Sequence, residues 1–207
     1  MKRVLALLLT LTLLLPLTAC GGGKDYVTEE EILPVARDLI ARSVAVNIAF
    51  LGDGIPVKEG AIAIGKYYPT DEEWLASHGI TSLDGLKAAA EAVYTGPLVA
   101  VLYQKAFPEG NLYYDYQERS IAQGKGILIL AEREPMLSWY QGVTHEYLYD
   151  TMRLTDAGVD SAKVTLDVKV TKGGVTQTRA LELRLVLTEA GWRCDNFTPV
   201  AFLNDDE

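Results

Sequence analysis

The first part of the chain repeats apolar residues with the period of an α-helix. In TEEEILPVARDLIARSVAVNIAFLG, residues 28–52, apolar side chains recur at near-helical spacing. Thr28 and Glu31 have the spacing of a capping box, in which each side chain bonds the backbone N–H of the other residue. Gly52 supplies a stop signal. The pattern therefore predicts a long helix that begins after Thr28 and ends near Gly52.

Two shorter helices are predicted before residue 110. In SLDGLKAAAEAVYT, residues 82–95, Thr81 or Ser82 supplies the N-cap. The apolar face of this helix consists of Leu83, Leu86, Ala90 and Val93. Gly96-Pro97 then interrupts the pattern, and PLVAVLYQKAF, residues 97–107, predicts a third helix.

Beyond residue 110 apolar and polar residues alternate, which is typical of half-buried β-strands. The clearest case is SAKVTLDVKVT, residues 161–171, followed by a hairpin turn at Lys172-Gly173-Gly174 and a leucine-rich return strand. Further strands are predicted at residues 111–116, 126–132, 146–154 and 192–197. Helices first and an antiparallel meander last predict an α+β fold in a single pair of layers, with the N-terminal helices packed on the C-terminal sheet.

The beginning of the chain has the features of an export signal. A basic start precedes a 14-residue apolar run, residues 4–17, which is shorter than the ~20 residues of a membrane-spanning helix. Leu17-Thr18-Ala19-Cys20 is similar to the lipobox of bacterial lipoproteins, in which cleavage precedes a cysteine that carries a diacylglycerol. We therefore expect a signal peptide at residues 1–19 and an anchor at Cys20 on the outer face of the bacterial cell membrane.

The rest of the chain is one domain in length. We expect a lipidated tether at residues 20–29, a single α+β domain at residues 30–203 and an acidic tail at residues 204–207. Cleavage of 19 of the 207 residues would leave 188. It would also shift the formal net charge from −9 to −11, since the signal peptide carries two basic residues. This acidic balance argues against nucleic acid as a partner and permits a basic protein.

Residues suited to catalysis are sparse. THEYLYD resembles the start of an H-E-x-x-H zinc motif, but residue 149 is Tyr, and the two histidines, His78 and His145, show no ligand spacing. Cys194 and His145 could form a nucleophile and base, but the alternation in WRCDNF instead favours a buried thiol. The sequence therefore predicts a protein that is not an enzyme and has no catalytic residues, metal site or cofactor.

Tyrosines are numerous and lie among acidic residues. The chain has 11 tyrosines and four phenylalanines, and the tyrosines gather at residues 66–74, 111–116 and 146–150. Tyrosine combines a large apolar face with a polar tip and is enriched in protein interfaces. The predicted partner-binding residues are Tyr67, Tyr68, Asp71, Glu72 and Trp74, in a segment expected to protrude before a capped helix. The alternative is that residues 70–73 cap a short helix and that Tyr68 and Trp74 lie in the core.

Several of these segments resemble a known family. They are SLDGLKAAAEAVYT, the Y-x-P-like segment at residues 67–69, an LY-containing strand after a Gly-Asn turn, and a closing meander that ends in GWRCDNF. Together they resemble clostridial lipoproteins of the DL-endopeptidase-inhibitor (IseA) family over about residues 30 to 200. The resemblance implies an exported protein that restrains NlpC/P60-type peptidases, which cut peptide stems in the cell wall.

The order of helices followed by a meander also looks like the NTF2-like fold. In that fold a curved sheet and helices often enclose a pocket for a small molecule. This weaker resemblance implies a different function, in which an extracytoplasmic domain binds a small ligand or a wall fragment. An apolar pocket against the sheet favours this function, whereas an acidic, tyrosine-rimmed protrusion or cleft favours the inhibitor.

Overall fold

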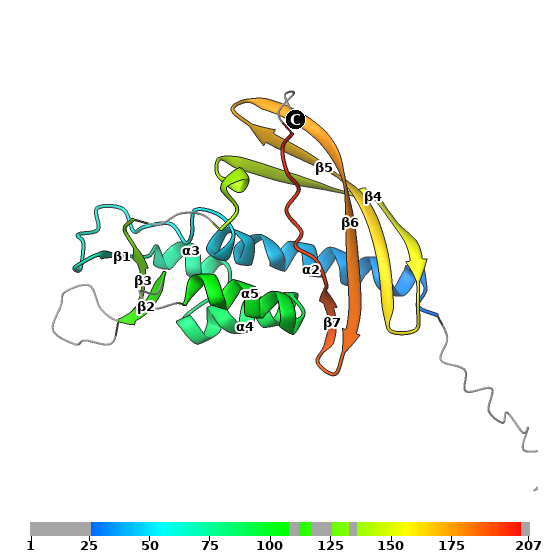
Figure 1. The fold of residues 1–207 in the computed structure, drawn as a ribbon, viewed down its shortest axis with the longest axis horizontal. Coiled ribbons are helices and arrows are strands. Elements are labelled where there is room, and N and C mark those ends of the chain that lie inside the picture. Colours follow the sequence, from blue (N-terminus) through cyan, green and yellow to red (C-terminus); the bar gives the residue numbers. More distant parts are fainter. Residues whose placement is uncertain (1–25, 108–111, 117–125, 133–135, 204–207) are drawn as a thin grey trace, which may run out of the picture.

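The computed structural model describes residues 26–107, 112–116, 126–132 and 136–203 (Figure 1). Its helices are α2 (Glu29–Phe50), α3 (Glu72–Ser77), α4 (Leu83–Val93) and α5 (Gly96–Ala106), and a 3-10 turn, η1, covers Ser138–Tyr140. The three helices predicted from periodicity are confirmed. The predicted signal peptide, Cys20 and the acidic tail lie outside the described residues.

The starts of α2 and α4 follow their capping signals. Glu31 N–H donates to Thr28 Oγ1 at 3.4 Å and Thr28 N–H donates to Glu31 Oε2 at 2.9 Å, so the predicted capping box is present. Ser82, one of the two predicted alternatives, is the N-cap of α4 and accepts from Gly85 N–H at 3.0 Å. The end of α2 also follows the prediction, because the helix ends at Phe50, Leu51 is the C-cap and Gly52 comes directly after it.

The four-stranded sheet is the predicted antiparallel meander. Its strands are β4 (Val143–Ala157), β5 (Ser161–Lys172), β6 (Val175–Thr188) and β7 (Gly191–Cys194), in the order β4-β5-β6-β7. Gly173 and Gly174 adopt positive φ angles of 58° and 84° in the predicted hairpin turn between β5 and β6. The alternating apolar residues of β5, with Leu181, Leu183 and Leu185 of β6, are buried on one face of the sheet. Val175 and Leu187, near the two ends of β6, are 58% and 44% exposed.

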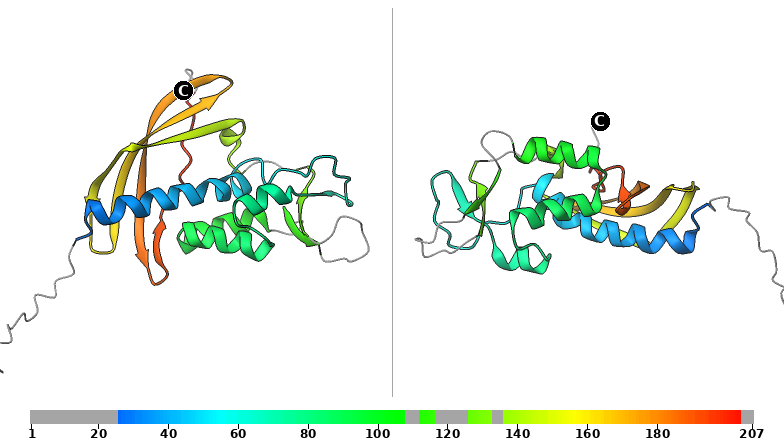
Figure 2. Two further views of the ribbon diagram at one scale, coloured as in Figure 1. Left: turned by 180° about the vertical axis from the view of Figure 1, so that it is seen from behind. Right: turned by 90° about the horizontal axis from the view of Figure 1, so that it is seen from below.

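Helices and sheet form the two layers that the sequence predicts. Figure 2 shows α2 lying along one face of the sheet, with α4 and α5 on the same side. The buried faces of these helices and of β5 and β6 belong to one hydrophobic core. The fold is therefore α+β, with N-terminal helices packed on a C-terminal antiparallel sheet.

A second, smaller sheet lies outside this pair of layers. It consists of β1 (Tyr67–Pro69), β2 (Tyr113–Tyr116) and β3 (Gly126–Leu130), all antiparallel, in the order β1-β3-β2. The predicted strands at 111–116 and 126–132 exist, but the expectation of a single pair of layers is wrong. We call residues 52–80 together with β2 and β3 the distal lobe, because they lie beyond the C-terminal end of α2 (Figure 1).

The chain ends in an extended segment rather than in a longer strand. The strand predicted at residues 192–197 stops at Cys194, and residues 195–203 form what we call the C-terminal strap (Figure 1). The strap is fixed at its far end by Gln177 of β6, whose amide donates to Leu203 O at 2.7 Å and accepts from Leu203 N–H at 3.1 Å.

A buried polar cluster joins the strap to the helices. Its members Ser43, Asn47, Tyr94 and Thr198 are at most 1% exposed. The Asn47 amide donates to Thr198 Oγ1 at 2.7 Å and accepts from the Tyr94 hydroxyl at 2.5 Å. Ser43 Oγ donates to Ile40 O and lies 2.7 Å from Thr198 Oγ1. Because buried polar groups are costly when unpaired, this network favours one placement of α2, α4 and the strap.

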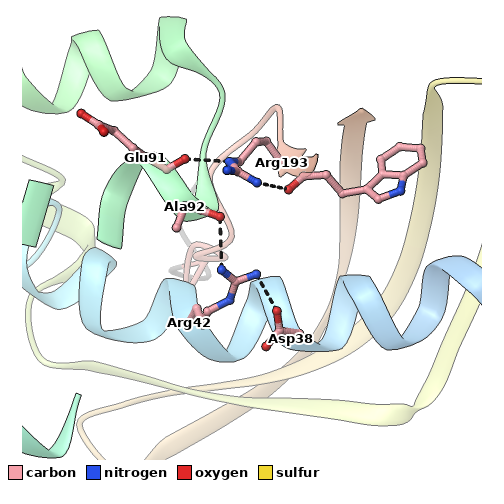
Figure 3. Close-up of polar contacts among 6 residues, drawn as sticks. Asp38, Arg42, Glu91, Ala92 and Arg193 are labelled. Carbon is pink, nitrogen blue, oxygen red and sulfur yellow. Dashed lines mark hydrogen bonds and ion pairs between the residues drawn. The ribbon is translucent and has the colours of Figure 1, made fainter. Parts of the chain in front are cut away.

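Two arginines from neighbouring elements cap the end of α4 (Figure 3). Arg193 of β7 donates to Glu91 O at 2.7 Å, and Arg42 of α2 donates to Ala92 O at 3.4 Å while pairing with Asp38. The last turn of α4 contains no basic residue of its own. These guanidinium groups therefore supply the positive charge and the donors that the C-terminal carbonyls of a helix favour.

Candidate functional site

The predicted partner-binding tyrosines lie in the distal lobe and form part of its sheet. Tyr67 and Tyr68 belong to β1 and pair with Leu130 and Ile129 of β3, so the expected protruding loop is a strand at this point. Both side chains are half-buried, and Tyr68 packs against the hydrophobic core. Tyr67 keeps a polar edge near solvent, where the Lys66 ammonium lies 5.6 Å from its ring centroid.

The other three predicted residues belong to α3 and its cap. Asp71 is the N-cap and accepts from the N–H groups of Glu73 and Trp74, whereas Glu72 is exposed and forms an ion pair with Lys58 at 3.6 Å. Trp74 packs against the core and against the ring of His78 at 4.3 Å. Tyr68 and Trp74 are half-buried and pack against the core, which is closer to the alternative interpretation, and of the five residues only Glu72 is exposed.

The distal lobe carries an apolar side chain that the sequence analysis did not select. Ile62 is 73% exposed, and it lies in the segment between α2 and β1 together with Val57, which is 37% exposed. Charged residues surround it in sequence, among them Lys58, Glu59 and Lys66, all exposed. The sequence signal for Ile62 was the apolar run AIAI, residues 61–64, between Gly60 and Gly65. Sequence analysis assigned this run to no helix or strand.

A groove runs along α2, between this helix and strand β4. We call it the α2–β4 groove, and it consists of two neighbouring hollows. The first has a volume of about 420 Å³ and is lined by Val44, Ile48, Gly52, Asp53, Tyr140, Gly142, Val143, Thr144, His145 and Tyr147. The second has a volume of about 570 Å³ and is lined by Leu33, Pro34, Arg37, Asp38, Ala41, Tyr149 and Met152. Both volumes lie in the range of small-molecule sites.

A row of aromatic rings forms the β4 wall of this groove. The ring centroids of Tyr140 and His145 are 5.2 Å apart, those of His145 and Tyr147 are 6.1 Å apart, and those of Tyr147 and Tyr149 are 6.4 Å apart. Residues 145, 147 and 149 alternate along one strand and so point to the same face. Burial raises the pKa of Tyr140 to about 12, so its hydroxyl is neutral across the physiological range.

An irregularity in β4 shapes the second hollow. Leu148 pairs with Asp167 and Arg153 with Thr165, so five steps along β4 match two along β5. Thr151 fills the gap in the ladder, because its Oγ1 accepts from Asp167 N–H at 2.8 Å and donates to Leu148 O at 2.7 Å. Such bulges bend a strand and redirect its side chains. Sequence analysis predicted this strand without the bulge. The Thr151 hydroxyl takes the place of a backbone acceptor for Asp167 N–H, and such a replacement leaves no periodic pattern in the sequence.

Arg37 lies over the end of the aromatic row. Its guanidinium carbon is 4.8 Å from the ring centroid of Tyr149. Burial raises the pKa of Tyr149, and the charge of Arg37 partly opposes that rise. The tyrosine cluster at residues 146–150 was the sequence signal for this site, but the sequence did not place α2 beside it.

His145 connects the groove to the C-terminal strap. His145 Nε2 lies 3.0 Å from Val200 N and 2.8 Å from Val200 O, so it accepts from the N–H in one tautomer of the neutral ring and donates to the carbonyl in the other. Burial lowers the pKa of His145 below its ordinary value of 6.5, and the contact with Val200 O partly opposes this effect. His145 lies on β4, an outer strand of its sheet.

We predict that His145 makes the protein less stable as the pH falls. The unfolded chain protonates this ring near pH 6.5, whereas the folded chain resists protonation because its pKa is lowered. The stabilising contribution is therefore complete above pH 6.5 and is lost as the pH falls through the folded pKa. Urea unfolding at pH 8 and pH 5 should show a larger loss for the wild type than for His145→Gln. An equal loss in the two proteins would contradict the prediction.

The described residues show no site for metal chemistry or for a reactive thiol. Cys194 is fully buried, as predicted, and burial raises its pKa to about 12. Within the described ranges no three His, Cys, Asp or Glu side chains are close enough together to hold a metal ion. No helix among the described residues is long and apolar enough to cross a membrane.

No protein-family model matches the chain, and no curated protein matches it either.

Proposed function

We propose that this protein is an exported lipoprotein that binds and restrains cell-wall DL-endopeptidases of the NlpC/P60 type. The lipobox-like segment supports an anchor at Cys20 on the outer face of the bacterial cell membrane. The resemblance to the DL-endopeptidase-inhibitor (IseA) family supports the choice of partner. The net charge of −9, or −11 without residues 1–19, favours a basic groove on that partner, because opposite potentials speed encounter.

The exposure of the apolar residue Ile62 in the distal lobe is the observation that carries this proposal. Ile62 is an apolar side chain in a charged surrounding, the composition of an interface anchor with a polar rim. Tyr67 and Glu72 lie nearby in the same lobe and remain candidates for the contact. The lobe lies at the far end of α2 from residue 26, and a helix of 22 residues is about 33 Å long. A partner can therefore reach the lobe without meeting the anchored end.

The test is an inhibition assay with purified peptidases of this type. The chain without residues 1–19, carrying Cys20→Ser, should slow the enzyme at micromolar concentration and low salt. Ile62→Asp should weaken inhibition about tenfold or more, because a buried interface anchor contributes about 1–2 kcal/mol or more. Glu72→Lys should weaken it less and in a salt-dependent way, because Glu72 is exposed.

Val175→Asp is the matched control, since Val175 is also an exposed β-branched apolar residue, 58% exposed, and lies in the β5–β6 hairpin outside the distal lobe. It should leave inhibition unchanged. The proposal fails if no NlpC/P60-type enzyme is slowed or bound under these conditions. A loss of inhibition by Val175→Asp with none by Ile62→Asp would place the contact elsewhere on the molecule.

A second candidate function is favoured by the α2–β4 groove. An extracytoplasmic domain that binds a small ligand or a wall fragment would have an aromatic-lined hollow between a helix and the sheet, as the NTF2-like resemblance implies. The two functions use different surfaces and can coexist. Variants of the distal lobe and of the groove therefore separate them.

A further inference from the structure

The two hollows of the α2–β4 groove form one continuous track. Of the residues of α2 that line the two hollows, 33, 37, 41, 44 and 48 follow one another at spacings of three or four and so share one face of the helix. Pro34 and Asp38 lie beside them in the lining, and Gly52 lies just beyond the C-cap. On β4, Tyr147 lines the first hollow and Tyr149 lines the second. These two tyrosines are neighbours on the same face of the strand, so the two hollows meet there. From Leu33 to Ile48 the helix rises about 22 Å. An extended peptide of about six residues has the same length.

One wall of the track is formed by a strand at the edge of its sheet. β4 is an outer strand of its sheet, and only β5 pairs with it among the described strands. At the N-terminal end of α2 the edge N–H of Leu154 donates to a side chain of the helix, Glu29 Oε1, at 3.4 Å. A side chain of the helix thus reaches the edge of β4 at this end of α2. Extended peptides bind such edges through main-chain hydrogen bonds.

Arg37 is the charged group that distinguishes one end of the track. It is exposed, and within the described part of the chain its contact is the stacking on Tyr149, with no ion pair or hydrogen bond. Arg42, little more than one turn further on, is in contrast paired with both Asp38 and Ala92 O. A guanidinium held against an aromatic ring keeps its fork of donors oriented, and this fork matches a carboxylate.

We propose that the α2–β4 groove binds an extended peptide that ends in a free carboxylate, with Arg37 as the carboxylate anchor. The row from Tyr149 to Tyr140 supports small or apolar side chains of the peptide, and the edge of β4 bonds its backbone. The inference rests on the second candidate function, ligand binding in the groove, and not on inhibition by the distal lobe.

The probe is the hexapeptide acetyl-Ala-Val-Ala-Val-Ala-Ala, compared as free acid and as C-terminal amide by isothermal titration. The protein is the chain without residues 1–19, carrying Cys20→Ser. The free acid should bind at least tenfold more tightly than the amide, because only the acid can pair with Arg37. Arg37→Gln should abolish this preference and leave the weak binding of the amide unchanged. The same variant should leave peptidase inhibition unchanged.

Arg153→Gln is the matched control. Arg153 is an exposed arginine of β4, and its neighbours Met152 and Leu154 pack against the core, so its side chain points away from them. This variant should keep the preference for the acid. A preference that is lost equally in both variants would show a general charge effect and overturn the proposal.

The remaining outcomes separate the inference from the function on which it rests. Equal binding of acid and amide would overturn the carboxylate anchor and leave ligand binding in the groove intact. Binding of neither peptide at millimolar concentration would contradict both.

Sedimentation equilibrium tests whether a second copy of the chain occupies the groove. Dimers that dissociate on adding the free acid would support a peptide track. Dimers that the acid does not displace would make a second copy of the chain the occupant instead.

Discussion

Replacing Asn47 with alanine is expected to lower the free energy of unfolding by about 3 kcal/mol. The side chain is fully buried and bonds both Thr198 Oγ1 and the Tyr94 hydroxyl. Truncation leaves these two groups with fewer partners in a dry site, and it also opens a small cavity. Burial already raises the pKa of Tyr94, which reflects how poorly this site accommodates charge. Urea unfolding followed by circular dichroism measures the change.

Gln104→Ala provides the matched control for Asn47→Ala. It removes an amide side chain from a helix, α5, but from an exposed position, so stability should change by no more than about 0.5 kcal/mol. If Asn47→Ala cost less than about 1 kcal/mol, the buried cluster would not hold α2, α4 and the strap together as described. Thr198→Val tests the same cluster from the strap and should cost about 1–3 kcal/mol.

The elements that the sequence predicts well are those whose signals are local. The capping box at Thr28 and the cap at Ser82 act within one turn of helix, so their residue types nearly determine where α2 and α4 begin. The alternation in β5 and β6 likewise reports a single buried face, and the glycines between them allow the turn. The burial of Cys194 was predicted in the same way, from the alternation in the segment WRCDNF.

The second sheet could not be predicted, because its pairing is not local. Tyr67–Pro69 is too short to show a period, and its partner β3 lies some 60 residues further along the chain. Thr70 reads as part of a capping signal, but its hydroxyl donates to Ile127 O at 2.7 Å, and Asp71 caps the helix instead. The predicted contact segment was consequently placed in a loop, when half of it forms a strand.

The groove was missed for a similar reason. Its aromatic row was visible as the tyrosine cluster at residues 146–150, but the opposite wall is α2, more than 90 residues earlier. The bulge at Thr151 and the position of the strap at His145 depend on single hydrogen bonds that no composition or period reveals. Sequence reasoning therefore identified the chemical character of this strand but not the site that it forms.

Replacing Tyr113 with alanine is expected to lower the free energy of unfolding by about 4 kcal/mol and to loosen the distal lobe. Tyr113 of β2 is fully buried, and its ring packs edge-on to Phe50 with the centroids 6.3 Å apart. Its hydroxyl donates to Ala49 O at 2.6 Å and accepts from Ile55 N–H at 3.0 Å. One side chain thus joins the small sheet to the end of α2 and to the segment that leads into the lobe.

Tyr113→Phe separates the hydroxyl from the ring. It keeps the packing against Phe50 but leaves the buried Ile55 N–H without this acceptor, so it should cost about 1–2 kcal/mol. Tyr26→Phe, at a tyrosine that is 69% exposed, should change stability by no more than about 0.5 kcal/mol. Hydrogen exchange locates the effect: amides of β1 and β3 should lose protection before those of β5 and β6. Equal loss of protection in both sheets would mean that the lobe and the main sheet unfold as one unit, and that Tyr113 does not control the lobe separately.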